Sequence, residues 1–199
     1  MALSTPDVPP QTTPCVGQER SRHLGLVFWF TGLSGAGKST IAQALEAHLK
    51  TQGLRTFILD GDIIRQGLCR DLGFSDVDRI ENNRRLMEVA RLMMEAGIIV
   101  IAAIISPFSE ERQKAKDRIG ADRFLEVFID TPLSVCQERD PKGLYQREIP
   151  LMTGIQSRYQ PPKKPDIHIK TTESLVSQSV DKILAHLKSH NLISYVSIL

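Results

Sequence analysis

The chain has 199 residues, a length typical of one globular domain with a sizeable core. Its 25 basic and 23 acidic residues leave a net charge of +2, so the charge favours neither a nucleic acid nor an anionic membrane as partner. The three cysteines have no C-x-x-C spacing and indicate neither a disulfide framework nor a zinc site. No apolar stretch reaches the length of a membrane span, so we expect a cytoplasmic protein without membrane contact.

The first 22 residues are rich in proline, serine, threonine and glutamine, and cannot bury enough apolar surface to offset their ordering entropy. We therefore expect a flexible N-terminal arm over residues 1–22 and one domain over residues 23–199. In that domain, strand-like runs alternate with helical patterns, which predicts a parallel sheet covered on both faces. The expected strands are 25–30, 54–59, 98–104, 124–129 and 167–169, and the expected helices are 39–52, 80–96, 110–119, 132–139 and 175–190.

A phosphate-binding loop of the form G-x-x-x-x-G-K-[ST] occupies residues 32–39. It follows an expected strand and opens an expected helix, so the helix amides face whatever the loop holds, and this context disfavours a glycine-rich turn without a ligand. Lys38 is predicted to reach the β- and γ-phosphates of ATP, and Ser39 to ligate Mg²⁺. The expected ATP-binding residues of this segment are Gly32, Leu33, Ser34, Gly35, Ala36, Gly37, Lys38, Ser39 and Thr40.

Two carboxylates, Asp60 and Asp62, follow the second expected strand. The carboxyl ends of the strands form the ligand-binding edge of a doubly wound sheet. A carboxylate there can act as a general base or hold the metal, and a turn followed by a helix N-cap would need the same residue type. The phosphate loop upstream favours a functional role, and Ser39 with Asp60 is the expected metal site.

A cationic stretch with the single aromatic residue Phe74 comes next and includes Arg65 and Arg79. Guanidinium groups pair with phosphate or sulfate, and the ring offers a stacking face for a base. Acidic neighbours make a solvated, salt-bridged helix face the simpler interpretation of these residues alone. Residues 143–165 have little apolar periodicity and several prolines, which predicts a loop, and loops of this length in kinases commonly act as lids.

Several strings of the sequence, taken together, resemble the adenylyl-sulfate kinase family over about residues 25–172; they are residues 32–40, 59–62, 70–75, 105–108, 126–128, 130–133 and 139–145. The resemblance implies a three-layer α/β sandwich of the phosphate-loop kinase fold, with a parallel five-stranded sheet in the order 2-3-1-4-5. It also implies Mg²⁺-dependent transfer of the γ-phosphate of ATP to the 3′-hydroxyl of adenosine 5′-phosphosulfate, which gives PAPS. Family members are often dimers, which leaves a homodimer open.

The resemblance also implies individual roles. Asp60 is the implied base near the 3′-hydroxyl, with Asp62 beside it, and Arg139 lies against the adenine of ATP. Ser106 occupies the position that family descriptions sometimes assign to a phosphoserine intermediate, although direct in-line transfer needs no such step. The candidate catalytic residues are thus Lys38, Asp60, Asp62 and Ser106, and the candidate substrate-binding residues are Arg65, Phe74, Arg79, Asn82, Ile105, Ser106, Lys142 and Met152.

The chain departs from the family pattern in and near the lid. Ile63, Cys69 and Ile104 stand where the family usually has Asn, Asn and Phe. After Tyr145 the loop is shorter than in the family, lacks its lysine pair, and has Met152 in place of a second stacking aromatic. These changes put acceptor affinity and turnover in question and leave nucleotide binding largely untouched.

Two rival functions follow from these departures. The first is a small-molecule kinase whose altered lid admits a different acceptor, and the retained Arg65, Phe74, Arg79 and Asn82 argue against it. The second is a nucleotide-binding module that has lost catalysis and acts by protein contact. The intact loop lysine and the two carboxylates argue against this second possibility.

Overall fold

The computed structural model describes residues 24–147 and 151–192, so the expected arm at residues 1–22 lies outside the described residues. Strands and helices alternate along most of the chain. In order they are β1 (Leu26–Thr31), α1 (Lys38–Thr51), β2 (Thr56–Asp60), α2 (Gly61–Gln66), α3 (Asp76–Glu95), β3 (Ile99–Ala103), α4 (Ser109–Ile119), β4 (Phe124–Asp130), α5 (Leu133–Arg139), β5 (Ile167–Lys170) and α6 (Val176–Ser189).

The five strands form one parallel sheet in the order β2-β3-β1-β4-β5, which confirms the expected fold and strand order. β1 lies at the centre, where Phe28 is in register with Ile101 of β3 and Leu125 of β4. All six residues of β1 are buried, because a central parallel strand is covered by helices on both faces.

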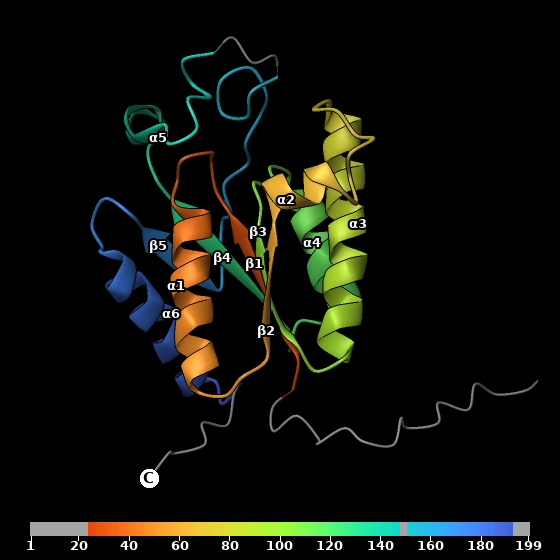
Figure 1. Cartoon of the computed structure of the whole chain (residues 1–199), viewed down its shortest axis with the longest axis vertical. Coiled ribbons are helices and arrows are strands. Elements are labelled where there is room, and N and C mark those ends of the chain that lie inside the picture. The colour runs from red at the N-terminus through yellow and green to blue at the C-terminus, as the bar shows by residue number, and fades with distance from the viewer. Residues whose placement is uncertain (1–23, 148–150, 193–199) are drawn as a thin grey trace, which may run out of the picture.

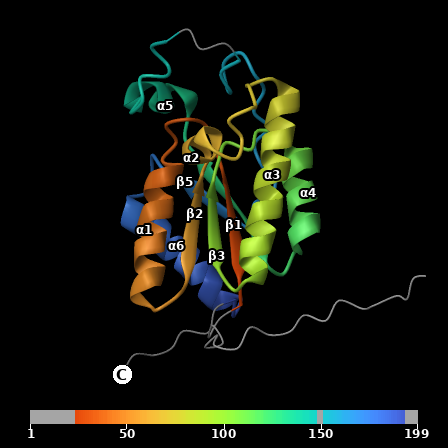
Figure 2. The same ribbon diagram turned by 45° about the vertical axis from the view of Figure 1, so that its right-hand side comes forward.

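Alternate residues of β1 face two separate hydrophobic cores. Phe28 and Phe30 pack in the core beneath α1 and α6, whereas Val27 and Trp29 pack in the core beneath α3 and α4. This alternation is the two-residue period of a strand. Figures 1 and 2 show the two helix pairs on opposite faces of the sheet, so the molecule has three layers.

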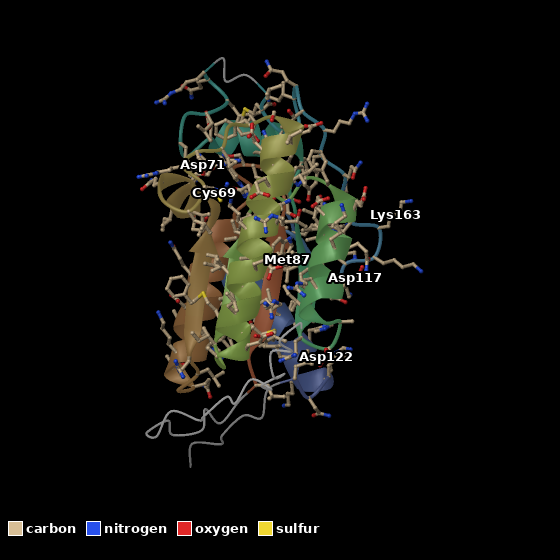
Figure 3. The ribbon with its side chains drawn as sticks, turned by 90° about the vertical axis from the view of Figure 1, so that its right-hand side faces the viewer. Cys69, Asp71, Met87, Asp117, Asp122 and Lys163 are labelled. Atoms are coloured by element: carbon tan, nitrogen blue, oxygen red, sulfur yellow. The ribbon has the colours of Figure 1, made fainter. Side chains whose placement is uncertain are left out.

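The layer made by α3 and α4 is held together at its surface by charged side chains. Figure 3 faces this layer, with Met87 on α3 and Asp117 on α4. Arg118 of α4 reaches Glu88 of α3, with Nε 3.0 Å from Oε1. Within the described ranges, no helix combines the length and apolar character needed to cross a membrane.

One helix boundary differs from the expectation, and one helix was not expected. α3 was expected over 80–96 but begins at Asp76, because the Ser75 hydroxyl caps it by accepting a hydrogen bond from the Asp78 amide at 3.2 Å. α2 was not expected as a helix. The helix has only six residues and none of them is buried, so its sequence carries no apolar periodicity from which a helix could be predicted.

The carboxyl ends of the strands carry the segments that build the site. The phosphate loop, α2, α5 and the loop that follows α5 gather at this end of the sheet (Figure 1). The expected loop at 143–165 contains no helix in its described residues, and its one isolated bridge joins Thr153 to Ser157.

Candidate functional site

The phosphate loop is a tight turn between β1 and α1. Gly35 has φ 75°, and a Cβ atom there would lie 2.9 Å from the carbonyl oxygen of Cys136, so this position requires glycine. Gly37, with φ 101°, is the residue before the helix and lets α1 begin at Lys38. The first amides of α1 therefore open directly onto the loop, which is the geometry of an anion-binding site.

Lys38 is buried beside this turn, with 8% of its surface exposed. Its Nζ atom donates hydrogen bonds to the carbonyl oxygens of Gly32, at 2.9 Å, and Leu33, at 2.6 Å. Burial lowers the pKa of Lys38 to about 8, because removal from water disfavours the charged form. A phosphate group at the loop would restore the missing counter-charge, so the side chain is suited to binding an anion.

Asp60 ends β2 and faces the phosphate loop with one of its two oxygens. Ser39 Oγ donates to Asp60 Oδ2 at 2.7 Å, while Asp60 Oδ1 accepts from the amide of Asp62 at 2.9 Å. One carboxylate therefore caps α2 and contacts the loop serine at the same time. The structure thus shows the N-cap that the sequence had offered as one alternative, and the role of Asp60 as a base or metal ligand stays a prediction.

Asp62 follows on the first turn of α2 and is exposed. Its Oδ2 atom forms an ion pair with Nζ of Lys142, which lies in the segment after α5. The pair joins two sides of the site. Asp62 belongs to α2, which precedes α3, and Lys142 lies directly before the lid at residues 143–165. Both residues line the same cavity.

This cavity of about 850 Å³ extends from the phosphate loop to the lid. It brings together all of the expected site residues except Gly32 and Leu33, which contribute the two carbonyl oxygens bound by Lys38. Its walls come from the phosphate loop, the starts of α2 and α3, the turn after β3 and the lid. Lining residues that the sequence analysis missed include Asn83, Thr153, Thr171, Leu175 and Val176.

The cationic stretch surrounds Phe74 at one end of the cavity. The Phe74 side chain is 48% exposed, and the guanidinium carbons of Arg65 and Arg79 lie 4.3 and 5.7 Å from its ring centroid. Arg65 Nη1 donates to the carbonyl oxygen of Gly73 at 2.8 Å, which fixes the guanidinium near the ring. Arg79 Nη2 donates to the carbonyl oxygen of Leu151 at 2.7 Å, so α3 contacts the lid.

Two buried side-chain oxygens in the described part of the chain have no hydrogen-bond partner: Oδ1 of Asn82 and Oγ1 of Thr153. Their residues are 7% and 3% exposed, and both line the cavity. An orphaned buried acceptor costs about 1–3 kcal/mol. A ligand in the cavity that donates hydrogen bonds to these oxygens would remove that cost.

Ser106 lies in the turn after β3 with 2% of its surface exposed. Its hydroxyl oxygen accepts hydrogen bonds from Nε1 of Trp29, at 3.0 Å, and from Nδ2 of Asn83, at 3.3 Å. Its backbone has φ 42°, in the left-handed region. The hydroxyl therefore already has two structural partners in this arrangement.

The end of the cavity nearest α5 contains Arg139. Its Nη1 and Nη2 atoms donate to Oγ1 and the carbonyl oxygen of Thr171, at 3.0 and 3.3 Å. Leu175 and Val176 lie at the start of α6 and are 70% and 40% exposed, so they add apolar surface to the same cavity. Sequence reasoning found Arg139 through its motif but missed the segment after β5, which carries no motif of its own.

The sheet order and the loop geometry define the class of this protein: it is a phosphate-loop kinase. A parallel sheet in the order β2-β3-β1-β4-β5 with a G-x-x-x-x-G-K-[ST] loop after its central strand is the nucleotide-binding framework of that class. The family model described as adenylylsulphate kinase matches residues 24–170. The chain therefore belongs to the adenylyl-sulfate kinase family.

Individual relatives agree with this assignment. The chain is 50% identical over 200 residues to an adenylyl-sulfate kinase of Escherichia coli, covering 97% of this chain and 99% of that protein. It is 54% identical over 181 residues to an adenylyl-sulfate kinase of Aeromonas salmonicida, covering 87% and 92% of the two chains. The Mycobacterium tuberculosis APS kinase, solved in complex with AMPPNP and APS, superimposes with a TM-score of 0.79 at 44% identity, covering 83% of this chain and 99% of that one.

Proposed function

We propose that this chain transfers the γ-phosphate of ATP to the 3′-hydroxyl of adenosine 5′-phosphosulfate (APS). The observation that carries the proposal is the single cavity that connects the phosphate loop to the residues around Phe74. Its volume of about 850 Å³ lies within the range of small-molecule sites. The partnerless oxygens of Asn82 and Thr153, which both line the cavity, support a polar ligand within it.

ATP binds with its phosphates on the loop and its adenine beside Arg139. Lys38 exchanges its two carbonyl partners for the β- and γ-phosphates, and its charge stabilises the negative charge that develops on the transferring group. The guanidinium of Arg139, tied to Thr171, offers a planar face on which the adenine stacks. Leu175 and Val176 supply apolar contact to the same base.

Ser39 and Asp60 fit the magnesium ion that the family implies. Their side-chain oxygens are 2.7 Å apart and are hard ligands of the kind Mg²⁺ prefers, and the ion commonly uses only one or two protein ligands beside phosphate and water. When bound, Mg²⁺ neutralises charge on the phosphate oxygens. Asp60 also stands at the end of β2, where its carboxylate can accept the proton of the attacking hydroxyl.

APS binds at the opposite end of the cavity. Arg65 and Arg79 pair with its phosphosulfate, Phe74 and Met152 contact its adenine, and Asn82 accepts a hydrogen bond from its sugar or base. Lys142 lies at the base of the lid, where its ion pair with Asp62 links the two sides of the cavity. Ile105 and Ser106 border the same space through the turn after β3.

Transfer is direct in this proposal, without a phosphoserine. The Ser106 hydroxyl accepts two hydrogen bonds and is 2% exposed, whereas phosphoryl transfer needs only positioning and charge stabilisation. A homodimer and a cytoplasmic location remain predictions that rest on the sequence alone.

The test is a transfer assay with γ-labelled ATP and Mg²⁺. APS is offered beside other adenine nucleotides and a panel of sugars, and Lys38→Ala serves as the inactive control. We expect label on the APS product alone, released with one ADP per transfer. Label on another acceptor, with none on APS, would contradict the proposed acceptor, and no label on any acceptor would contradict the assignment of catalysis.

A further inference from the structure

Arg112 of α4 fixes the turn after β3, residues 105–107, to residues 159 and 160, which we call the returning end of the lid. Arg112 is 3% exposed, and its Nη1 and Nη2 atoms donate to the carbonyl oxygens of Ser106 and Gln160, both at 2.7 Å. Its Nε atom donates to Oε1 of Glu126 at 2.6 Å, which fixes the plane of the guanidinium. One side chain thus holds two segments that are far apart in the sequence.

A second bridge joins the same two segments through Thr31 and Tyr159. Thr31 Oγ1 donates its proton to the carbonyl oxygen of Ile105 at 2.7 Å, so the Tyr159 hydroxyl is the donor in its 3.0 Å contact with Thr31 Oγ1. The Tyr159 ring lies 6.3 Å from that of Phe128, centroid to centroid. Both the hydroxyl and the ring therefore hold Tyr159 against the sheet.

Gln160 completes this connection. Its amide donates to the carbonyl oxygen of Pro107 at 2.9 Å, and its Oε1 atom accepts from the amide and the hydroxyl of Ser109, at 2.8 and 2.9 Å. Gln160 is consequently tied to the end of the turn at Pro107 and to the first residue of α4.

Both tied segments lead to the cavity, but the residues that tie them do not line it. Residues 105–107 form one wall, and Met152 and Thr153 lie in another, whereas Arg112, Tyr159 and Gln160 are absent from the lining. Between Met152 and the returning end, the amides of residues 155–157 all donate to the Met152 carbonyl oxygen, at 3.0 to 3.2 Å. This compact turn connects Met152 to residues 159 and 160.

We propose that Arg112 and Tyr159 are positioning residues that hold these two walls at the separation the acceptor nucleotide requires. The inference rests on the proposed function, since it assigns APS to this end of the cavity. The Arg112 side chain bonds to no residue of the phosphate loop in the described structure, and the Tyr159 hydroxyl bonds to Thr31, which precedes the loop, so we expect a larger effect on acceptor binding than on ATP binding. The charged bridge through Arg112 is the stronger of the two, because bonds to a charged donor exceed neutral ones.

Two conservative variants test the proposal, with a matched control on the same helix. Arg112→Lys keeps a cation opposite Glu126 but loses the fork that reaches both carbonyl oxygens, and Tyr159→Phe removes only the hydroxyl. Arg118→Lys makes the same exchange on an exposed part of α4 and serves as the control. In steady-state kinetics, we expect KM for APS to rise about tenfold in Arg112→Lys and about threefold in Tyr159→Phe.

KM for ATP should stay within about twofold of the wild-type value in both variants. It serves as the internal control, because a general loss of structure would raise KM for both substrates. Amide hydrogen exchange without any nucleotide supplies a readout independent of activity. We expect residues 151–157 to exchange faster in both variants than in Arg118→Lys. Unchanged exchange there, or an equal rise of both KM values, overturns the inference, whereas an inactive wild-type protein with faster exchange in the variants contradicts only the proposed function.

Discussion

Replacing Ser106 by alanine should damage stability more than catalysis. The change removes the oxygen that accepts hydrogen bonds from Trp29 Nε1 and Asn83 Nδ2, and these donors belong to side chains that are 0% and 4% exposed. An orphaned buried donor costs about 1–3 kcal/mol, and the longer contact to Asn83, at 3.3 Å, is the weaker of the two. We therefore expect the free energy of unfolding to fall by about 3 kcal/mol. Turnover should stay within about tenfold of wild type, because direct transfer does not use the hydroxyl.

Urea unfolding and the γ-labelled transfer assay measure the two effects on one preparation. Ser189→Ala removes an exposed hydroxyl bonded only to nearby groups of α6 and its cap, and is the matched control. The reasoning fails if Ser106→Ala unfolds at the wild-type urea concentration but turns over about a thousandfold more slowly. An acid-stable phosphate on Ser106 that forms and decays as fast as turnover would establish the covalent route instead.

Lys38→Ala should lower turnover about a hundredfold or more with an unchanged fold, because one charge on the transferring group is lost; activity within a few-fold of wild type would refute the role of the loop. ATP affinity should decline as pH rises above about 8, since the free lysine then loses the proton that the phosphates require; a flat calorimetric profile would contradict this. Met152→Phe should tighten APS binding by about twofold to tenfold, since stacking adds about 0.5–1.5 kcal/mol. Phe74→Ala should weaken APS binding further than that, and a loss confined to ATP would reverse the assignment of the two adenine sites.

The fold was predictable because its signals are local and periodic. The apolar run at 26–30 and the loop behind it predicted a strand, the alternation of strands and helices predicted the parallel sheet, and the resemblance to the family supplied the strand order. The structure places the remaining boundaries within a few residues of those expected. α2 escaped prediction because its cap at Asp60 is a single side-chain contact and its face is exposed.

The site was predictable only in part. Residues within a recognisable motif were predicted, whereas residues that reach the cavity from a distant part of the sequence were missed. Lys38, Ser39 and Asp60 carry chemistry that their motifs reveal, and the structure brings them together as expected. Thr171 and the first residues of α6 join the cavity only because β5 pairs with β4 at the edge of the sheet. The sequence contains no motif that links that segment to Arg139, and the two come together only in the folded sheet.

The lid, which by resemblance is shorter than in the family, shows why the sequence alone could not predict how this loop packs. Its turn is held at Met152 by three amides, and Gly154, with φ 89°, meets the phosphate loop, since a Cβ atom there would lie 2.8 Å from Cδ2 of Leu33. The lid therefore packs against both the ATP loop and, through Gln160, the turn after β3. Met152 is 9% exposed and lines the cavity, so the loop delivers an apolar side chain to the cavity. If the proposed acceptor site is correct, the exchange of an aromatic ring for a thioether removes stacking, and we expect that loss to fall on acceptor affinity rather than on the position of the lid.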